Sequence, residues 1–79
     1  MAESKYIKFT DERPSLSGKT KIWIIRTKEG NAVLGTIKWF ANWRYYGFYP
    51  ESETVFEQQC LRDIANFCEE QTKLQKAKS

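Results

Sequence analysis

The chain has 79 residues, of which 41% are hydrophobic and 15% are aromatic, and its formal net charge is +3. A chain this short has little interior to divide, so one domain is expected over residues 1–79, with residues 1–5 and 73–79 frayed. It contains no run of about 18 apolar residues, which excludes a membrane-spanning helix. The first residues lack the apolar region of a secretory signal, so a cytoplasmic protein is expected.

The first part of the chain predicts one clear strand and one uncertain one. Residues 6–9 alternate weakly, which is consistent with a short edge strand, and residues 11–19 are rich in turn formers and predict a loop. Residues 20–27 (TKIWIIRT) are β-branched and aromatic, which favours a strand. A turn at residues 28–31 then leads to a second clear strand at residues 32–40 (AVLGTIKWF).

A third clear strand is predicted at residues 44–49 (RYYGFY), after a turn at residues 41–42. Pro50 ends this strand, because proline cannot donate to a strand ladder. Short turns join neighbouring strands in antiparallel pairs. The pattern therefore predicts an antiparallel meander of three strands, or of four if residues 6–9 join it.

Turn lengths predict which side chains share a face of the sheet. A first turn of two or four residues pairs even-numbered residues of one strand with odd-numbered residues of the next. The drier face is assigned to the core, and it holds Ile22, Ile24, Val33, Gly35, Ile37 and Trp39. The other face holds Lys21, Trp23, Ile25, Thr36 and Lys38. A two-residue second turn adds Tyr46 and Phe48 to the core face and leaves Tyr45 and Tyr49 outside, whereas a three-residue turn exchanges these pairs.

The last part of the chain predicts a helix over residues 55–72. Thr54 and Glu57 have the spacing of a capping box, and the apolar stripe that follows consists of Cys60, Leu61, Ile64, Phe67 and Cys68. Residues 55–56 are alternatively a short extended segment before a later helix start. The fold class is therefore α+β, with one C-terminal helix packed on one face of the antiparallel sheet.

Residue types argue against an enzyme, a metal site and a bound cofactor. The chain has no histidine, and Cys60 and Cys68 lie about 12 Å apart on the predicted helix, too far for a disulfide. Both cysteines are predicted to be small apolar residues of the core, which fits a reducing compartment. The carboxylates Glu51, Glu53 and Glu57 precede the helix, where the helix dipole favours acids without any catalytic role.

Charge is unevenly distributed along the chain. Residues 19–49 carry six basic residues against Glu29 alone, whereas residues 51–70 carry six acidic residues against Arg62 alone. The predicted sheet is therefore basic and the predicted helix acidic, and the two surfaces favour different partners.

One helix covers one face of the sheet, so the other face is predicted to be an exposed basic and aromatic surface. The candidate interaction residues are Lys21, Trp23, Lys38, Trp43, Tyr45 and Tyr49. Aromatic residues of this kind dominate protein interfaces, which favours a protein partner or a homodimer. The alternatives are single-stranded nucleic acid, whose bases stack on aromatics while lysines contact phosphates, and simple shielding of a monomer's open face.

Residues 34–72 resemble a pattern found in small uncharacterised proteins of bacteriophages and prophages. The resemblance is carried by a Leu-Gly-x-Ile-Lys-Trp strand, a Trp-Arg-x-Tyr turn, and the segments Thr-Val-Phe and Cys-Leu-x-Asp-Ile-x-x-Phe. In this chain those positions are Leu34, Gly35, Ile37, Lys38, Trp39, Trp43, Arg44, Tyr46, Tyr49, Pro50, Thr54, Val55, Phe56, Cys60, Leu61, Asp63, Ile64 and Phe67. It implies a phage accessory protein in the bacterial host cytoplasm and brings no catalytic or binding residue with it. With the surface above, it predicts a small protein–protein interaction module.

Overall fold

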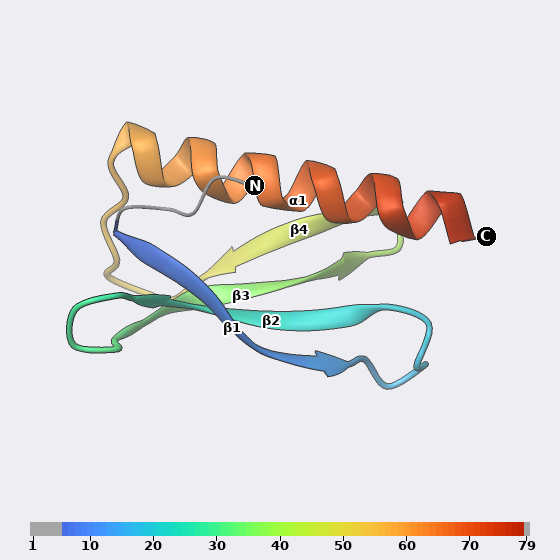
Figure 1. Cartoon of the computed structure of the whole chain (residues 1–79), viewed down its shortest axis with the longest axis horizontal. Coiled ribbons are helices and arrows are strands. Elements are labelled where there is room, and N and C mark those ends of the chain that lie inside the picture. Colours follow the sequence, from blue (N-terminus) through green and yellow to red (C-terminus); the bar gives the residue numbers. More distant parts are fainter. Residues whose placement is uncertain (1–5, 79) are drawn as a thin grey trace.

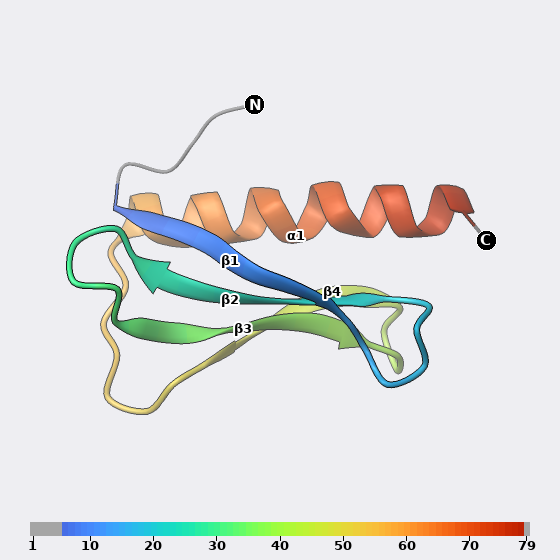
Figure 2. The same ribbon diagram turned by 60° about the horizontal axis from the view of Figure 1, so that its bottom comes forward.

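Four strands and one helix follow one another in the computed structural model, which describes residues 6–78 (Figure 1). They are β1 (Ile7–Pro14), β2 (Lys21–Thr27), β3 (Val33–Phe40), β4 (Tyr45–Pro50) and α1 (Gln58–Lys78). The strands form one antiparallel sheet in the order β1-β2-β3-β4, and α1 forms a second layer on one of its faces (Figure 2). The predicted α+β meander with one C-terminal helix is confirmed.

The possible edge strand at residues 6–9 is part of a full fourth strand, β1, which begins at Ile7 and continues to Pro14 through the segment predicted to be a loop. A bulge between Thr10 and Arg13 accommodates the turn-forming residues, and Asp11 within it has a φ of 55°. The bulge adds one residue to β1 without ending its pairing with β2.

The predicted core face of β2 is wrong, because the register changes within the β2–β3 hairpin. Thr27 N donates to Ala32 O (2.9 Å), so the turn has the predicted four residues. Arg26 then pairs with Val33, but Ile25 pairs with Gly35, which leaves Leu34 as an extra residue on β3. This bulge inverts the parity of all later pairs, in the way that a one-residue slip exchanges the faces of a strand.

The inverted parity places Trp23 opposite Ile37 and on the face covered by α1. Trp23 is 4% exposed, and Ile25 and Ile37 are also buried. Ile22 and Ile24 therefore point away from the helix and are half-buried, while Val33 is 41% exposed. Gly35, Ile37 and Trp39 lie on the core side as predicted, and the residues that were placed on the wrong face are Lys21, Ile22, Trp23, Ile24, Ile25 and Val33.

The β3–β4 hairpin places its side chains on the faces that a two-residue turn predicted. Phe40 pairs with Tyr45, so the turn contains residues 41–44 and has the same parity as a two-residue turn. Tyr46 and Phe48 consequently lie on the core side, and Tyr49 lies on the other.

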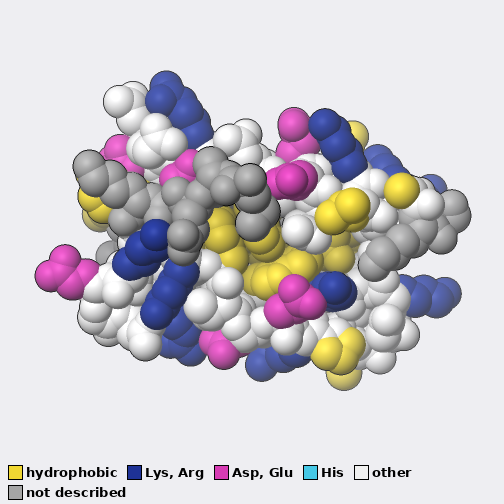
Figure 3. Space-filling view, in the orientation of Figure 1, with side chains coloured by type: hydrophobic (Ala, Val, Ile, Leu, Met, Phe, Trp, Pro, Cys, Tyr) yellow, Lys and Arg dark blue, Asp and Glu magenta, His cyan; other side chains and the backbone are white. Residues whose placement is uncertain are grey.

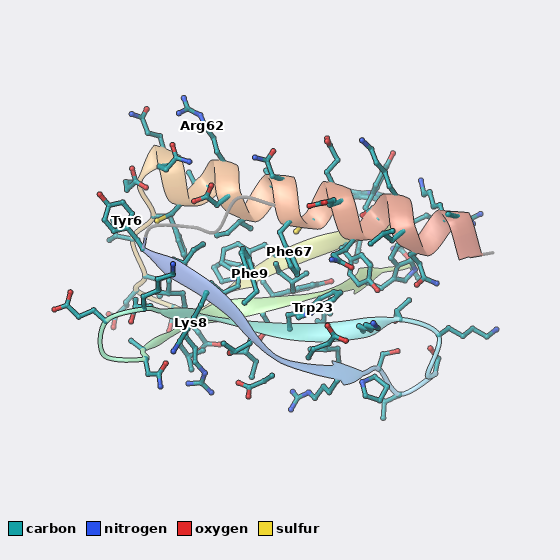
Figure 4. All side chains as sticks on the ribbon, viewed as in Figure 1. Tyr6, Lys8, Phe9, Trp23, Arg62 and Phe67 are labelled. Atoms are coloured by element: carbon teal, nitrogen blue, oxygen red, sulfur yellow. The ribbon has the colours of Figure 1, made fainter. Side chains whose placement is uncertain are left out.

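Aromatic rings fill the space between the sheet and α1 (Figure 4). Phe9 stacks on Phe67 with ring centroids 4.1 Å apart, and Trp23 makes edge contacts with Phe67 (5.0 Å) and Tyr46 (5.3 Å). Hydrophobic side chains are visible between α1 and β1 in the space-filling view (Figure 3). The core therefore combines these large aromatics with four buried isoleucines, Ile7, Ile25, Ile37 and Ile64.

Two buried hydroxyl groups fix the helix to the sheet. Thr72 Oγ1 accepts a hydrogen bond from Tyr46 N (3.0 Å) and donates one to Cys68 O (2.7 Å). Tyr46 Oη in turn accepts from Lys21 N (3.0 Å) on β2. These bonds orient the C-terminal half of α1 over β4 and β2.

The helix begins at Gln58, three residues later than predicted, and no capping box forms. Thr54 Oγ1 donates to Glu51 O (2.8 Å), whereas Glu57 itself caps the helix by accepting from Cys60 N (2.6 Å). Backbone N–H groups of Gln59 and Cys60 hold the pKa of the Glu57 carboxyl below its usual range. Residues 55–56 precede the helix, as the alternative interpretation expected.

The helix continues to Lys78, six residues beyond its predicted end at residue 72. The last turns gain contacts that a sequence pattern does not show. Lys73 Nζ pairs with Glu69 Oε1 (3.8 Å), and Lys76 Nζ lies 4.4 Å from the ring centroid of Tyr45. Residues 1–5 and 79 lie outside the described part of the chain.

Both cysteines are free, as predicted, and Cys60 is buried while Cys68 is half-buried. Burial raises the pKa of the Cys68 thiol to about 11. At pH 8 we expect Cys68 to react with iodoacetamide roughly a hundredfold more slowly than a free cysteine, whose pKa is about 8.5, because the thiolate is the reactive form. Mass spectrometry of the alkylated peptides measures this rate, and alkylation as fast as that of unfolded protein would contradict the packing of Cys68.

Candidate functional site

The face of the sheet that points away from α1 is called the open face. Side chains alternate along each strand, so those paired with one another and excluded from the core share this face. The open face consists of Lys8, Thr10, Arg13, Ile22, Ile24, Arg26, Val33, Thr36, Lys38, Phe40 and Tyr49, with Tyr45 at its β4 edge. It is a mixed surface, with two isoleucines at its centre and cations around them.

The open face has positive charge. The described residues that form it include four cations and no carboxylate, and Asp11 in the β1 bulge pairs with one of them, Arg26 (3.2 Å). Lys8, Arg13 and Lys38 add to the field of this face. Lys38 Nζ lies 4.4 Å from the ring centroid of Tyr49, so a cation and an aromatic ring occupy neighbouring positions on β3 and β4.

The six predicted interaction residues do not form one surface. Lys38 and Tyr49 lie together on the open face. Tyr45 lies at the β4 edge beneath Lys76, and Trp43 is 72% exposed in the β3–β4 turn, where it contacts Phe40 edge-on (5.0 Å).

Trp23 and Lys21 were predicted to lie on the exposed face, but both lie on the opposite side of the sheet, so this prediction is wrong. Trp23 Nε1 donates to Glu12 Oε1 (3.1 Å), and Lys21 Nζ pairs with Glu12 Oε2 (3.0 Å). Both contacts belong to the side of the sheet that α1 covers. Trp23 is therefore a core residue and cannot contact a partner without unfolding.

Sequence reasoning missed the part of the open face that β1 contributes. In the β1–β2 register, Lys8 lies opposite Arg26 and Arg13 lies opposite Ile22. The alternation of residues 6–9 was the signal for Lys8, since a fourth strand places its side chain on the face opposite to the buried Ile7 and the half-buried Phe9. No comparable signal existed for Arg13, because the bulge that directs it to this face lies in a segment with the composition of a loop.

Several cations gather at one end of the molecule and several carboxylates at the other. The β1–β2 loop, the β3–β4 turn and the end of α1 meet at one end (Figures 1 and 2). This basic end carries Lys19, Lys21, Arg44, Lys73 and Lys76. The opposite end carries the acidic residues of the β2–β3 turn and the β4–α1 connection, namely Glu29, Glu51, Glu53 and Glu57.

A protein of Acholeplasma phage L2, called "Uncharacterized 9.3 kDa protein", is 35% identical to this chain over 43 residues. The match covers 54% of this chain and 55% of that protein, so the chain spans about half the length of the relative it matches. No family model and no solved structure matches the chain. Within residues 6–78, no helix has the length and apolar character needed to cross a membrane. The similarity supports a small phage-associated protein.

Proposed function

We propose that this protein is a phage accessory protein that binds single-stranded nucleic acid on the open face of its sheet. The observation that carries the proposal is the charge of this face, where Lys8, Arg13 and Lys38 surround an accessible sheet surface. Phosphates of a single strand are attracted to such a surface without any need for a base-specific contact.

The open face also offers contacts to sugars and bases. Thr36 lies between Ile24 and Tyr49 in one row across β2, β3 and β4. Neighbouring strands are about 4.8 Å apart, so a nucleic-acid strand that crosses the sheet along this row meets an aliphatic, a hydroxyl and an aromatic side chain in turn. Tyr49 provides the stacking surface, and Lys38 beside it provides the charge.

Burial of Trp23 changes the balance between the two functions that the sequence suggested. Trp23 was one of the aromatic residues on which the protein interface was predicted, and it lies in the core. The fourth strand adds Lys8 and Arg13 to the open face instead. Cations around a surface strengthen its electrostatic attraction for anions such as phosphates, whereas hydrophobic association depends on apolar side chains.

Protein association, including a homodimer, is the second candidate function. Ile22 and Ile24 favour it, because both are half-buried on the open face and form its apolar centre. Light scattering distinguishes the candidates. A dimer that persists at high salt and fails to bind an oligonucleotide would support protein association and contradict the proposal.

Replacement of Lys38 with glutamine tests the proposed interface. We expect the affinity for a fluorescein-labelled mixed-sequence 20-nucleotide DNA to fall about three- to tenfold at low salt, since one phosphate contact is lost. The slope of log K against log salt should become shallower by about 0.7, the value for one phosphate of a single strand. Fluorescence anisotropy over a series of NaCl concentrations measures both quantities.

Arg62→Gln is the matched control. It removes the same charge from an exposed position on α1, near the helix start and on the other side of the molecule (Figure 4). Its affinity and salt slope should stay within about twofold of the unmodified protein. Equal losses in Lys38→Gln and Arg62→Gln would show that only net charge matters and would overturn the assignment of the open face.

A further inference from the structure

A small pocket opens at the basic end of the molecule, between segments far apart in the sequence. Its volume is about 200 Å³. The β1–β2 loop, the β3–β4 hairpin and the last turns of α1 each contribute to its wall. The residues that line it are Ser17, Lys19, Thr20, Trp39, Arg44, Gln75 and Lys76.

The pocket is lined by three cations, Lys19, Arg44 and Lys76. None of the described residues in its wall is acidic, and the remaining polar groups are two hydroxyls and an amide. Guanidinium and ammonium groups are the side chains best suited to bind a phosphate group, so this lining favours an anion of that kind.

The backbone of Arg44 gives an independent reason to assign a function to this pocket. Arg44 has a φ of 58°, in the left-handed region that glycine and asparagine adopt more readily than arginine. The turn is closed by bonds from Arg44 N (2.9 Å) and Trp43 N (3.3 Å) to Phe40 O. The backbone conformation at this turn position favours glycine or asparagine, but the residue is arginine. Residues that depart from such backbone preferences are often found at functional sites.

Two walls of the pocket are held in place without a ligand. In the β1–β2 loop, Ser15 N donates to Thr20 O (2.9 Å), and Lys19 N donates to Ser17 Oγ (3.2 Å). On α1, the ring of Tyr45 lies 4.4 Å from Lys76 Nζ and restrains this side chain. A site whose cations are already positioned loses less entropy when an anion binds.

We propose that this pocket binds a phosphate group of a nucleic-acid strand. The inference rests on the proposed function and adds a second contact region to it. Trp43 precedes Arg44 in the same turn and is 72% exposed, with its ring edge-on to Phe40. Trp43 therefore offers an exposed ring for a base of the same strand, on the turn that also carries Arg44.

The test uses ¹⁵N-labelled full-length protein and two ligands. Inorganic phosphate is titrated against sodium chloride of equal ionic strength, and amide shifts are followed by NMR. We expect saturable, phosphate-specific shifts at Ser17, Lys19, Arg44 and Lys76, and shifts at the same amides with a 5′-phosphorylated mixed oligonucleotide. Shifts that chloride reproduces, or that lie elsewhere, would overturn the proposal.

Three variants make the result specific to Arg44. Arg44→Asn removes the charge but keeps a residue that tolerates positive φ, so the turn and fold are retained. It should weaken phosphate binding at least tenfold, whereas Arg44→Lys should keep most of the affinity and Arg62→Gln should keep all of it. Phosphate binding by Arg44→Asn equal to that of the unmodified protein would exclude the pocket.

Failure of the pocket and failure of the open face give different results. Phosphate shifts in the pocket together with oligonucleotide binding that is insensitive to Lys38→Gln would retain the pocket and reject the open face. Oligonucleotide shifts along β1 and β3 with no change at Ser17, Lys19, Arg44 and Lys76 would retain the open face and reject the pocket.

Discussion

Replacing Trp23 with alanine is expected to lower the free energy of unfolding by about 3–5 kcal/mol. Trp23 is 4% exposed and contacts the rings of Tyr46 and Phe67, and its Nε1 donates to Glu12 Oε1. The substitution leaves a cavity in the centre of the core and removes one hydrogen bond to Glu12, whose ion pair with Lys21 remains. Urea denaturation followed by circular dichroism measures the change.

Such a loss is large for this chain, since stability amounts to roughly 0.05–0.15 kcal/mol per residue. Trp43→Ala is the matched control, because it makes the same chemical change at a side chain that is 72% exposed. Only the edge contact with Phe40 is lost, which corresponds to about 0.5–1.5 kcal/mol. A small effect of Trp23→Ala would mean that Trp23 lies on the open face, as the turn length alone suggested.

The second large effect is expected for Gly35→Ala, which should lower the free energy of unfolding by about 2–3 kcal/mol or more. A Cβ atom at Gly35 would lie 2.5 Å from Phe48 Cε1 and 2.6 Å from the backbone oxygen of Tyr49. Phe48 could rotate, but the carbonyl of Tyr49 cannot move without a shift of β4. The β3–β4 pairing at this end of the sheet must therefore distort.

Gly47→Ala is the control for Gly35→Ala. Its new Cβ would meet its nearest atoms at 3.9 and 4.0 Å, which is ordinary van der Waals contact. Neither Gly35 nor Gly47 has a positive φ, so the two variants differ mainly in space and not in backbone strain. We expect Gly47→Ala to be neutral or to stabilise the protein by up to about 1 kcal/mol. Urea midpoints of the two variants measured side by side would contradict the packing around Gly35 if they were equal.

The elements of this fold could be predicted from the sequence because each has a strong local pattern. The β-branched composition of residues 20–27 identifies a strand, and the helical spacing of the apolar stripe from Cys60 to Cys68 identifies a helix. The length of the first turn was also right. These features depend on neighbours in the chain, so no tertiary information was needed.

The faces of β2 could not be predicted, because residues 22–25 are all apolar. Isoleucine occupies positions 22 and 24, and tryptophan and isoleucine occupy positions 23 and 25. The hydrophobic pattern therefore allows either face to be buried, and the choice falls to the register. That register depends on the bulge at Leu34, and a prediction from turn length alone does not include a bulge.

Only the part of the candidate site that lies on the β3–β4 hairpin could be predicted from the sequence. Lys38 and Tyr49 were placed together because the β3–β4 turn has the parity that was considered. The pocket at the basic end joins Lys19, Arg44 and Lys76, which are separated by 25 and 32 residues in the chain. No spacing rule brings such residues together, because their proximity depends on how α1 crosses the completed sheet.

The salt dependence of oligonucleotide binding tests the central claim most directly. Binding of a mixed-sequence single strand, measured by anisotropy from low to physiological NaCl, should give a linear plot of log K against log salt. Three phosphate contacts, made by Lys8, Arg13 and Lys38, correspond to a slope of about −2, and contacts at the basic end would make it steeper. Absence of binding at the lowest salt concentration, or binding with a slope near zero, would contradict nucleic-acid recognition by this protein.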